Sequence, residues 1–399
     1  MPVLFGIILL DIAGFGILLP SIMYVLHNMG AAPGYATIIV ATYSIGQFIA
    51  GPMWGRLSDR IGRKPVLMIS MAGAFSAYVL MALANTPEMI LFSRIVAGLM
   101  AGNIATAYAA VADLTPPEKR AKGMGVLGAA FGLGFVVGPA IGGFLGGDTP
   151  ETANIYYPAV ASAFMSILAF SATLFFFRES LPVEIRDELK AQPKQSRFAA
   201  VRHLAKRPIL IRFCAFILMV AITSALMEPV LPLLVGNRYD WGPLHMGYIF
   251  TAVGLTIAAV QGGLVGKLAA SIGEKRMVQL ALAMVLTGLG IIIVTPISYG
   301  VVLGLMLTGV GQTLFTTAIG ALASQRAGPT ERGLVMGVVQ SMQSFGRSIG
   351  PLATGTLFVY WEELPYLVGM VLITVALVWV TMLIRTTVIA DATTITAKK

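Results

Sequence analysis

Four charged side chains lie well inside long apolar runs of the sequence, namely Asp11, Arg94, Glu228 and Arg347. Placing such a charge at the centre of a membrane-spanning helix costs about 2.5–3.5 kcal/mol, so these residues generally face a cavity or a partner and often relay protons. We therefore predict that Asp11 carries protons and that Arg94 takes part in the coupling. The alternative, a static Asp11–Arg94 ion pair that stabilises the fold, stays open.

The depth of each residue indicates which of them can meet. With a rise of 1.5 Å per residue, Asp11 lies about 13 Å from the beginning of its run, and Asn103 lies at a similar depth in the fourth run. We expect these two residues to share a cavity wall. Arg94 lies on the same run as Asn103, about 13 Å further from that side, so contact with Asp11 requires an inward reach or a tilt. Glu228 is predicted to meet a cationic substrate or to pair with Arg347.

Polar and aromatic side chains on the same runs could form a surface for a small molecule. The predicted substrate-binding residues are Tyr43, Gln47, Asn103, Phe131, Glu228, Gln261, Gln312, Gln340, Gln343 and Arg347. Any one glutamine could instead make a hydrogen bond between helices, which is worth about 0.6 kcal/mol on average.

The elements that must position these side chains are membrane-spanning helices. Only 11% of the 399 residues are charged and 57% are hydrophobic, against about 25% charged residues in soluble domains, which excludes a water-soluble enzyme. The apolar runs exceed the roughly ten residues of a barrel strand and suit helices of about 20 residues. We expect the first run to stay in the mature protein, because no basic segment precedes it. Twelve spans are predicted at residues 2–27, 34–56, 65–84, 89–112, 123–146, 156–177, 208–236, 243–266, 276–297, 299–324, 333–358 and 364–385.

The loop charges predict the topology. Of the 27 Lys and Arg residues, 23 lie in loops and tails that share one side, and Arg238 alone lies in the opposite loops. The positive-inside rule then places both termini in the cytoplasm, in a membrane of the bacterial inner type. The excess of basic residues is thus explained by topology, and no nucleic-acid partner is expected.

A long charged connector and an internal repeat divide the chain. The segment GRLSDRIGRK at 55–64 matches GKLAASIGEK at 266–275, and further on Gly134 and Gly138 match Gly346 and Gly350, with offsets of 211 and 212. We predict an N-terminal six-helix bundle (1–177), a solvated cytoplasmic connector (178–207) and a C-terminal six-helix bundle (208–399). Two-half transporters of this kind bind substrate at the repeat interface.

The decapeptide Gly55-Arg-Leu-Ser-Asp-Arg-Ile-Gly-Arg-Lys64 resembles the signature of the major facilitator superfamily. Arg94-Ile-Val-Ala-Gly98 resembles the buried arginine motif of that family, and the glycines and proline of the fifth span resemble its antiporter motif. The residues of the antiporter motif are Gly125, Gly134, Gly138, Pro139, Gly142 and Gly143. The resemblance implies an all-α membrane protein with the major facilitator fold, twelve helices in two bundles of six.

Among the twelve-span drug exporters of this family, the chain is most similar to the tetracycline/proton antiporters. It departs from them where they carry aspartates in the third and ninth spans, since Ala77 and about Val285 stand at these places. The resemblance therefore implies proton-coupled efflux of small amphiphilic compounds without pointing to tetracycline. The alternatives are a proton-coupled carrier of a sugar, a siderophore or another metabolite, and a membrane sensor that does not transport.

The resemblance also implies a conformational latch between the two halves on the cytoplasmic side. Its predicted members are Gly55, Asp59, Arg60, Gly62, Arg63, Lys64 and Asp113. The second repeat has Ala270, Ser271 and Glu274 at three of these places, so the latch is expected on one side only. The alternative is an ordinary loop anchored to the anionic inner leaflet.

No cofactor, metal or catalytic residue is expected. The lone Cys214 excludes a disulfide framework or a cysteine metal cluster, and no phosphate-binding loop for ATP is present. The fifth span is expected to pack closely against neighbouring helices through the glycine pairs Gly128 and Gly132, Gly134 and Gly138, and Gly138 and Gly142. We expect the proton gradient as the energy source, and small molecules, protons and the lipid bilayer as partners of a monomer.

Overall fold

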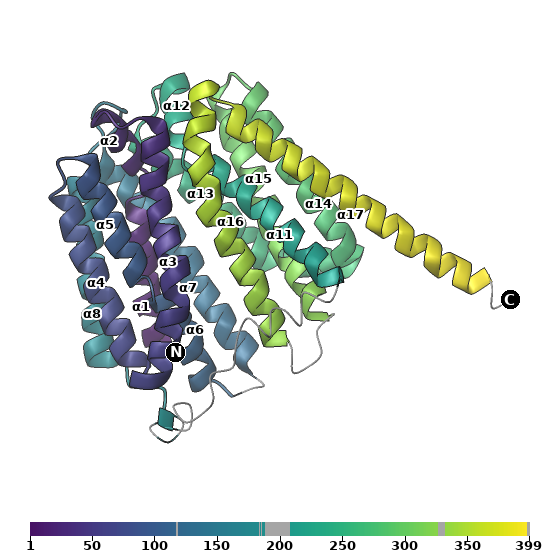
Figure 1. The fold of residues 1–399 in the computed structure, drawn as a ribbon, viewed down its shortest axis with the longest axis horizontal. Helices are drawn as coiled ribbons and strands as arrows, with labels where there is room; N and C mark the ends of the chain where they lie inside the picture. The colour runs from purple at the N-terminus through teal and green to yellow at the C-terminus, as the bar shows by residue number, and fades with distance from the viewer. Residues whose placement is uncertain (117–118, 183, 185, 188–207, 326–331, 397–399) are drawn as a thin grey trace. The chain divides into compact units, whose positions relative to one another are not determined.

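The protein is described by a computed structural model, which covers residues 1–116, 119–182, 184, 186, 187, 208–325 and 332–396. These residues form helices joined by turns, and no strand occurs among them. The helices are α1 (Pro2–Ile17), α2 (Ile22–Asn28), α3 (Pro33–Ile61), α4 (Arg63–Ala82), α5 (Pro87–Met100), α6 (Asn103–Leu114), α7 (Arg120–Gly146), α8 (Tyr156–Phe176), α11 (Pro208–Met227), α12 (Leu231–Tyr239), α13 (Pro243–Gly263), α14 (Val265–Val294), α15 (Ser298–Gln325), α16 (Arg332–Tyr360) and α17 (Leu364–Thr396) (Figure 1).

Every predicted span corresponds to helix. Ten helical stretches of the described chain are long and apolar enough to cross a membrane, and one of them, 243–294, contains the eighth predicted span and the ninth up to residue 294. Within it, α14 is kinked at Gly273, whose φ of 75° is not helical. The eleventh predicted span, α16, is a helix of 29 residues that is not among the ten. It carries Gln340, Gln343 and Arg347, which make it more polar than the others.

Three of the predicted spans are broken well inside their length, which the apolar pattern does not indicate, and the eighth is interrupted near its end at Leu264. The first divides into α1 and α2 around Pro20, and the seventh divides into α11 and α12 at residues 228–230, which include Pro229. Proline lacks an N–H and clashes with the carbonyl group four residues back, which explains both breaks. The fourth span divides into α5 and α6 at Ala101 and Gly102, where no proline occurs.

The residues group into two compact units, which are described separately. Unit 1 contains Met1–Gln195, Glu228–Gly254 and Pro351–Val359, and unit 2 contains Ser196–Met227, Leu255–Gly350 and Tyr360–Lys399. Segments from the second half of the sequence therefore pack within unit 1. The predicted domain boundaries at 177 and 208 stay a prediction.

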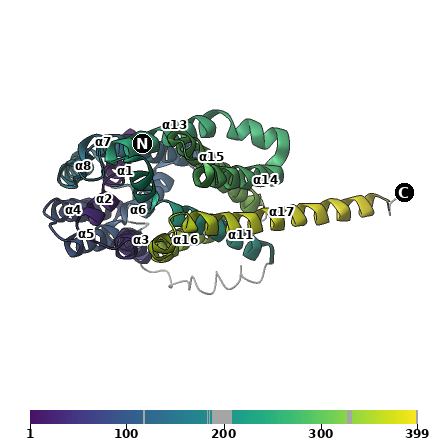
Figure 2. The same cartoon turned by 90° about the horizontal axis from the view of Figure 1, so that it is seen from above.

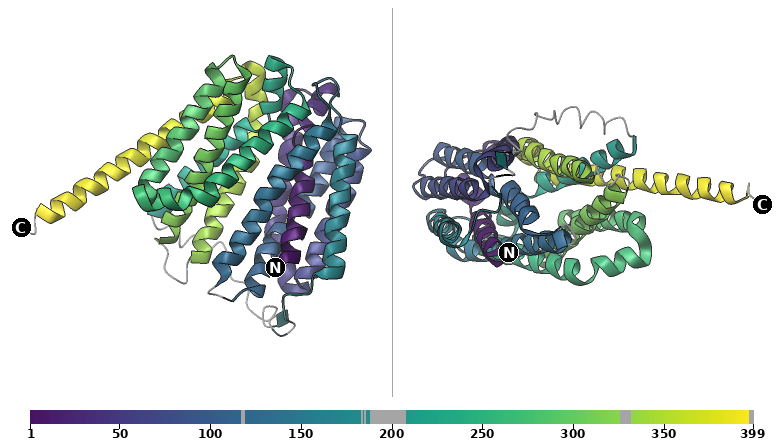
Figure 3. Two further views of the ribbon diagram at one scale, coloured as in Figure 1. Left: turned by 180° about the vertical axis from the view of Figure 1, so that it is seen from behind. Right: turned by 90° about the horizontal axis from the view of Figure 1, so that it is seen from below.

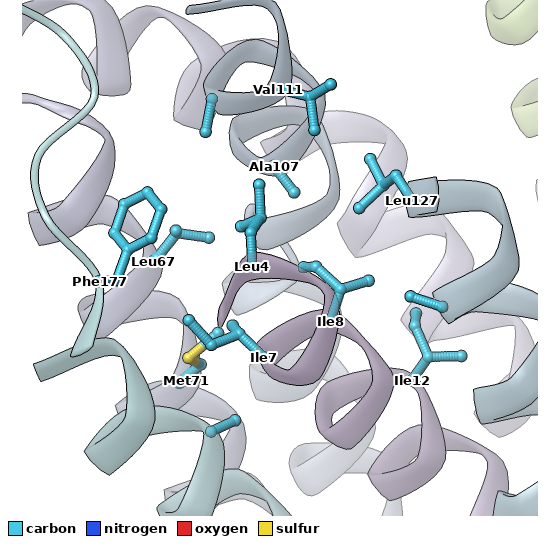
Figure 4. Packing of buried hydrophobic residues seen from close by; sticks show 13 residues of the cluster. Leu4, Ile7, Ile8, Ile12, Leu67, Met71, Ala107, Val111, Leu127 and Phe177 are labelled. Atoms are coloured by element: carbon cyan, nitrogen blue, oxygen red, sulfur yellow. The ribbon is translucent and has the colours of Figure 1, made fainter. Parts of the chain in front are cut away.

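Helix α1 lies inside unit 1, in contact with α6, α7 and α8 (Figure 2). The views from behind and from below show α7 running beside it (Figure 3). Leu4, Ile7 and Ile8 of α1 are at most 1% exposed, and their helical spacing directs them into the bundle. The rest of this core includes Ile12, Leu67, Met71, Ala107, Val111, Leu127 and Phe177 (Figure 4). The packing holds α1, and with it Asp11, in a defined position.

At the opposite end from the N-terminus, α2 and the loop before α8 meet the loop between α12 and α13 within unit 1. The Tyr24 hydroxyl donates to the Trp241 carbonyl oxygen at 2.7 Å, and Gly242 N–H donates to the Asp148 carbonyl oxygen at 3.2 Å. Tyr24 is only 2% exposed. These bonds join segments from the two halves of the sequence.

Candidate functional site

Asp11 and Asn103 meet inside unit 1. Both are buried, with 8% and 6% of their surface exposed, and Asn103 Nδ2 donates a hydrogen bond to Asp11 Oδ2. The other amide atom, Asn103 Oδ1, accepts from Ile104 N–H at 2.8 Å. Asn103 is the first residue of α6, so the break in the fourth span determines where its side chain lies. The predicted proximity of the two residues is confirmed, and Asp11 has a polar partner that is neutral.

Arg94 is 2% exposed and lies against aromatic rings. Its guanidinium carbon is 4.7 Å from the ring centroid of Tyr43 and 5.6 Å from that of Phe15, and the two rings stack at 4.6 Å. Close packing brings α3 to α5, because a Cβ on Gly98 would lie 2.5 Å from the Tyr43 carbonyl oxygen. A desolvated cation–π contact contributes about 2 kcal/mol, which offsets part of the cost of burying the charge.

No ion pair joins Asp11 to Arg94, although both lie in the described part of the chain. The interpretation as a static ion pair is therefore wrong for this structure. Arg94 Nε is buried and has no hydrogen-bond partner. The cation thus retains a free donor inside the bundle, beside Phe15, which is four residues after Asp11 on α1.

Glycines of the predicted antiporter motif bring α7 against α1. Gly134, Gly138 and Gly142 are four residues apart and therefore lie on one face of α7. A Cβ on Gly138 would lie 2.6 Å from the Ala13 carbonyl oxygen, and a Cβ on Gly142 would overlap with the Ile17 carbonyl group. Only glycine permits this approach, and the helix it positions is the one that carries Asp11.

The other two motif residues at this end also make close contacts. Pro139 lies 3.0 Å from where a Cβ of Gly16 would stand, so the ring packs on α1 as well. Gly143 faces α13 instead, because its Cβ would lie 2.7 Å from the Gly247 Cα atom. The motif thus packs against one helix from each half of the sequence.

Three glycines at the beginning of α7 behave differently. No atom of the described chain lies within 4 Å of a Cβ placed on Gly125, Gly128 or Gly132, apart from the helix's own backbone. The predicted close packing through Gly128 and Gly132 is therefore wrong. A role for Gly125 in transport stays a prediction.

The internal repeat reappears in the packing of unit 2. A Cβ on Gly346 would lie 2.6 Å from the Ala221 Cβ atom, and a Cβ on Gly350 would lie 2.9 Å from the Ala225 carbonyl carbon. Helix α16 therefore packs against α11 as α7 packs against α1. The sequence match thus corresponds to a repeated helix–helix contact.

At the cytoplasmic end predicted from the loop charges, Arg63 is the centre of a charge cluster. Its side chain donates to Asp59 Oδ1 at 2.6 Å, to Asp113 Oδ2 at 2.9 Å and to Ser58 Oγ at 2.7 Å. The Arg63 side chain is 6% exposed, against 44% for Asp59 and 20% for Asp113. The structure therefore brings together three predicted latch residues within unit 1. Their action as a latch between the halves stays a prediction.

The other predicted latch residues surround this cluster. Gly62 has a φ of 106° between α3 and α4, which favours glycine, and Lys64 Nζ donates to the Leu174 carbonyl oxygen at 2.7 Å. Arg60 is exposed, and Gly55 has no neighbour within 4 Å of a Cβ in the described chain.

Glu179 is a functional candidate that the sequence interpretation missed. Its carboxylate accepts from Arg63 N–H at 2.8 Å and from Lys64 N–H at 3.1 Å, which caps the first turn of α4. The adjoining Leu181 is 3% exposed. The solvated connector stays a prediction, because Arg178, Glu179 and Pro182 are exposed, Leu181 is buried, and residues 188–207 lie outside the described part.

The remaining predicted substrate residues divide between the two units. Phe131 of α7 stacks with Tyr108 of α6 at 6.2 Å, and Glu228 is exposed in the break between α11 and α12. Gln47 and Phe131 are partly buried in unit 1, Gln312 and Gln343 are partly buried in unit 2, and Gln261, Gln340 and Arg347 are exposed in unit 2. No group of His, Cys, Asp and Glu side chains in the described residues could hold a metal ion.

The sequence of this chain is similar to those of known proteins. The family model of the Major Facilitator Superfamily matches residues 4–351 and 221–395. The chain belongs to the Major Facilitator Superfamily. It is 31% identical to the class E tetracycline resistance protein of Escherichia coli over 382 residues, which cover 93% of this chain and 92% of that protein. It is also 31% identical to multidrug resistance protein 2 of Bacillus subtilis (strain 168), over 89% of this chain and 87% of that protein.

Solved structures of this superfamily share the fold. The human organic anion transporter MFSD10 (TETRAN) has a TM-score of 0.69 and 24% identity, and covers 95% of this chain and 98% of its own. A D-xylose–proton symporter has a TM-score of 0.74 and 16% identity, and covers 95% and 96%. The predicted major facilitator fold is confirmed, and the chain is a multi-pass membrane transporter of small molecules.

Proposed function

We propose that this transporter exports small amphiphilic compounds in exchange for protons. The observation that carries the proposal is the buried Asp11, which is bound by Asn103 and positioned by the glycine face of α7. A carboxyl group at this place is costly unless it faces a cavity or a partner in the working protein. The tetracycline and multidrug resistance relatives support drug efflux as the direction and cargo.

In the proposed cycle, Asp11 binds a proton from the outer side and releases it to the cytoplasm. Arg94 acts together with Asp11, and its unpaired Nε offers a donor to the substrate or to a water molecule. Proton entry is downhill, since one elementary charge moving through 100 mV releases about 2.3 kcal/mol, and this drives substrate outward. Both termini are cytoplasmic in a bacterial-type inner membrane, and the working unit is a monomer.

Alternating access also requires contacts between the sequence halves to open. The bonds from Tyr24 to Trp241 and from Gly242 to Asp148 join the halves at one end. The Arg63 cluster lies at the end that the loop charges predict to be cytoplasmic. We propose that the former bonds close the outer side and that the cluster takes part in closing the inner side.

The test uses purified protein in liposomes with an internal pH indicator. Outward-directed gradients of cationic and neutral drugs should move protons in the opposite direction, and Asp11→Asn should abolish this movement. Asp148→Asn is the matched control, because that side chain is exposed and its contact uses the backbone. Proton movement that survives in Asp11→Asn would remove Asp11 from the proposed role. Substrate and protons that move in the same direction would instead identify a symporter.

A further inference from the structure

The break in the fourth span lies immediately before Asn103. Ala101 has a ψ of 52°, outside the helical region, and Gly102 N–H bonds to the carbonyl of Met100, two residues back, at 2.7 Å. An unbroken helix would pair Leu99 O with Asn103 N–H and Met100 O with Ile104 N–H. Ile104 N–H bonds to the Asn103 side chain instead. The break therefore leaves Leu99 O without its helical partner, and Met100 O keeps only the bond from Gly102 N–H within its own segment.

Side chains of two neighbouring helices donate hydrogen bonds to these carbonyl oxygens. Trp54 of α3 donates its indole N–H to Leu99 O at 2.7 Å. Ser70 of α4, which is 1% exposed, donates to Met100 O and accepts from Gly102 N–H at 3.0 Å. Inside a bilayer, a backbone carbonyl group without a hydrogen-bond partner is costly whether it faces protein or lipid. The two side chains thus stabilise the broken conformation relative to a continuous helix.

The packing at the break has complementary shapes. A Cβ on Gly102 would lie 2.5 Å from the Cβ and Cδ1 atoms of Trp54, so the indole occupies the space that the missing side chain leaves. The Met100 side chain fills the corresponding space on Gly73 of α4, where a Cβ would lie 2.7 Å from its Sδ atom. Both glycines are therefore needed for the break to have this geometry.

We propose that Trp54 and Ser70 are positioning residues for the proton site. They cap the break that directs Asn103 to Asp11, and the proposal rests on the function given above for Asp11. Trp54 also lies five residues before Asp59 on α3, about 7.5 Å along the helix.

The experiment compares Trp54→Phe and Ser70→Ala with controls that make the same changes elsewhere. Trp361→Phe alters a tryptophan that is 55% exposed, and Ser76→Ala alters an exposed serine of the same α4, which bonds only within its own helix. Hydrogen exchange of residues 99–106 should become about fivefold faster or more in the two test variants, as for loss of one hydrogen bond, and should stay unchanged in the controls.

The second measurement is the pH profile of substrate-driven proton movement in liposomes. Trp54→Phe and Ser70→Ala should shift the midpoint in the same direction as Asn103→Ala, and combining either with Asn103→Ala should shift it no further. The effects of two substitutions that act through the same contacts are not additive. A purely structural role would lower the amount of folded protein without moving the midpoint.

Two results would overturn the assignment. Unchanged exchange would mean that the caps do not hold the break, and faster exchange with an unshifted midpoint would mean that the break does not position the proton site. Proton coupling that is retained in Asp11→Asn removes Asp11 from the role proposed for it above. The positioning of Asn103 by the two caps is then decided by the exchange rates alone.

Discussion

Gly142→Ala and Gly128→Ala make the same chemical change at two places on α7 that have opposite surroundings. A Cβ on Gly142 would overlap with the Ile17 carbonyl oxygen and lie 2.7 Å from its carbon, whereas a Cβ on Gly128 has no neighbour within 4 Å in the described chain. The pair therefore separates the steric effect of the methyl group from its effect on the helix backbone.

The magnitude follows from the distances. Ordinary carbon–oxygen contacts between helices are about 3.3–3.6 Å, so Gly142→Ala forces α7 and α1 apart by roughly an ångström. Overpacking of this kind costs about 1–3 kcal/mol, while alanine in place of glycine in a helix interior gains up to about 1 kcal/mol. We expect Gly142→Ala to be less stable than Gly128→Ala by about 1–3 kcal/mol, since the backbone gain is common to both.

Thermal unfolding in detergent, followed by tryptophan fluorescence, measures this difference. The midpoint of Gly142→Ala should lie several degrees below that of Gly128→Ala, and its transport rate should fall as well, because α1 carries Asp11. Equal midpoints, or a lower midpoint for Gly128→Ala, would refute the packing of α7 on α1 as the origin of the glycine pattern.

Three further predictions concern the contacts around the site. Glu179→Gln weakens the cap of α4, so hydrogen exchange of its first turn should rise about fivefold or more, and Glu184→Gln, which alters an exposed side chain of the same segment, should leave it unchanged. Asp113→Asn removes one of two carboxylates from the buried Arg63 guanidinium, and denaturant unfolding should show a loss of about 1–3 kcal/mol; an unaltered free energy would contradict the ion-pair geometry. Tyr24→Phe removes one hydrogen bond between the sequence halves. Spin-label distances across this end should show that the population open to the outer side rises about fivefold. Unchanged distances would mean that this bond does not help to close the outer side.

Much of the helical framework could be predicted because a bilayer imposes strong rules. Each span needs about 20 apolar residues, so the apolar runs predicted the spans to which the described helices correspond. Neighbouring spans cross the same thickness, and equal depth therefore predicted the meeting of Asp11 and Asn103. The four-residue spacing of Gly134, Gly138 and Gly142 likewise predicted one contact face.

The break at Gly102 could not be predicted from the apolar pattern, because a broken and a continuous span have the same composition. Its available signal is a glycine followed by Asn103 in the middle of a run. The bond that holds it comes from Trp54, which is 45 residues from Leu99 in the sequence. Glu179 lies 115 residues from Lys64. Contacts at such separations depend on the tertiary arrangement.

The internal repeat preserves the helix packing of this transporter but not its buried acid. Gly134 contacts Ile12 where Gly346 contacts Ala221, so the first helices of the two halves correspond with an offset of 209. Asp11 then corresponds to Val220, which is 4% exposed and apolar. The second half repeats the helix packing without an acid at this position, because a duplicated scaffold needs only the glycine contacts. A single carboxyl group in one half suffices for an exchanger if that half moves as a body against the other. Val220→Asp, introduced into the Asp11→Asn variant, should therefore destabilise the protein and should not restore proton coupling.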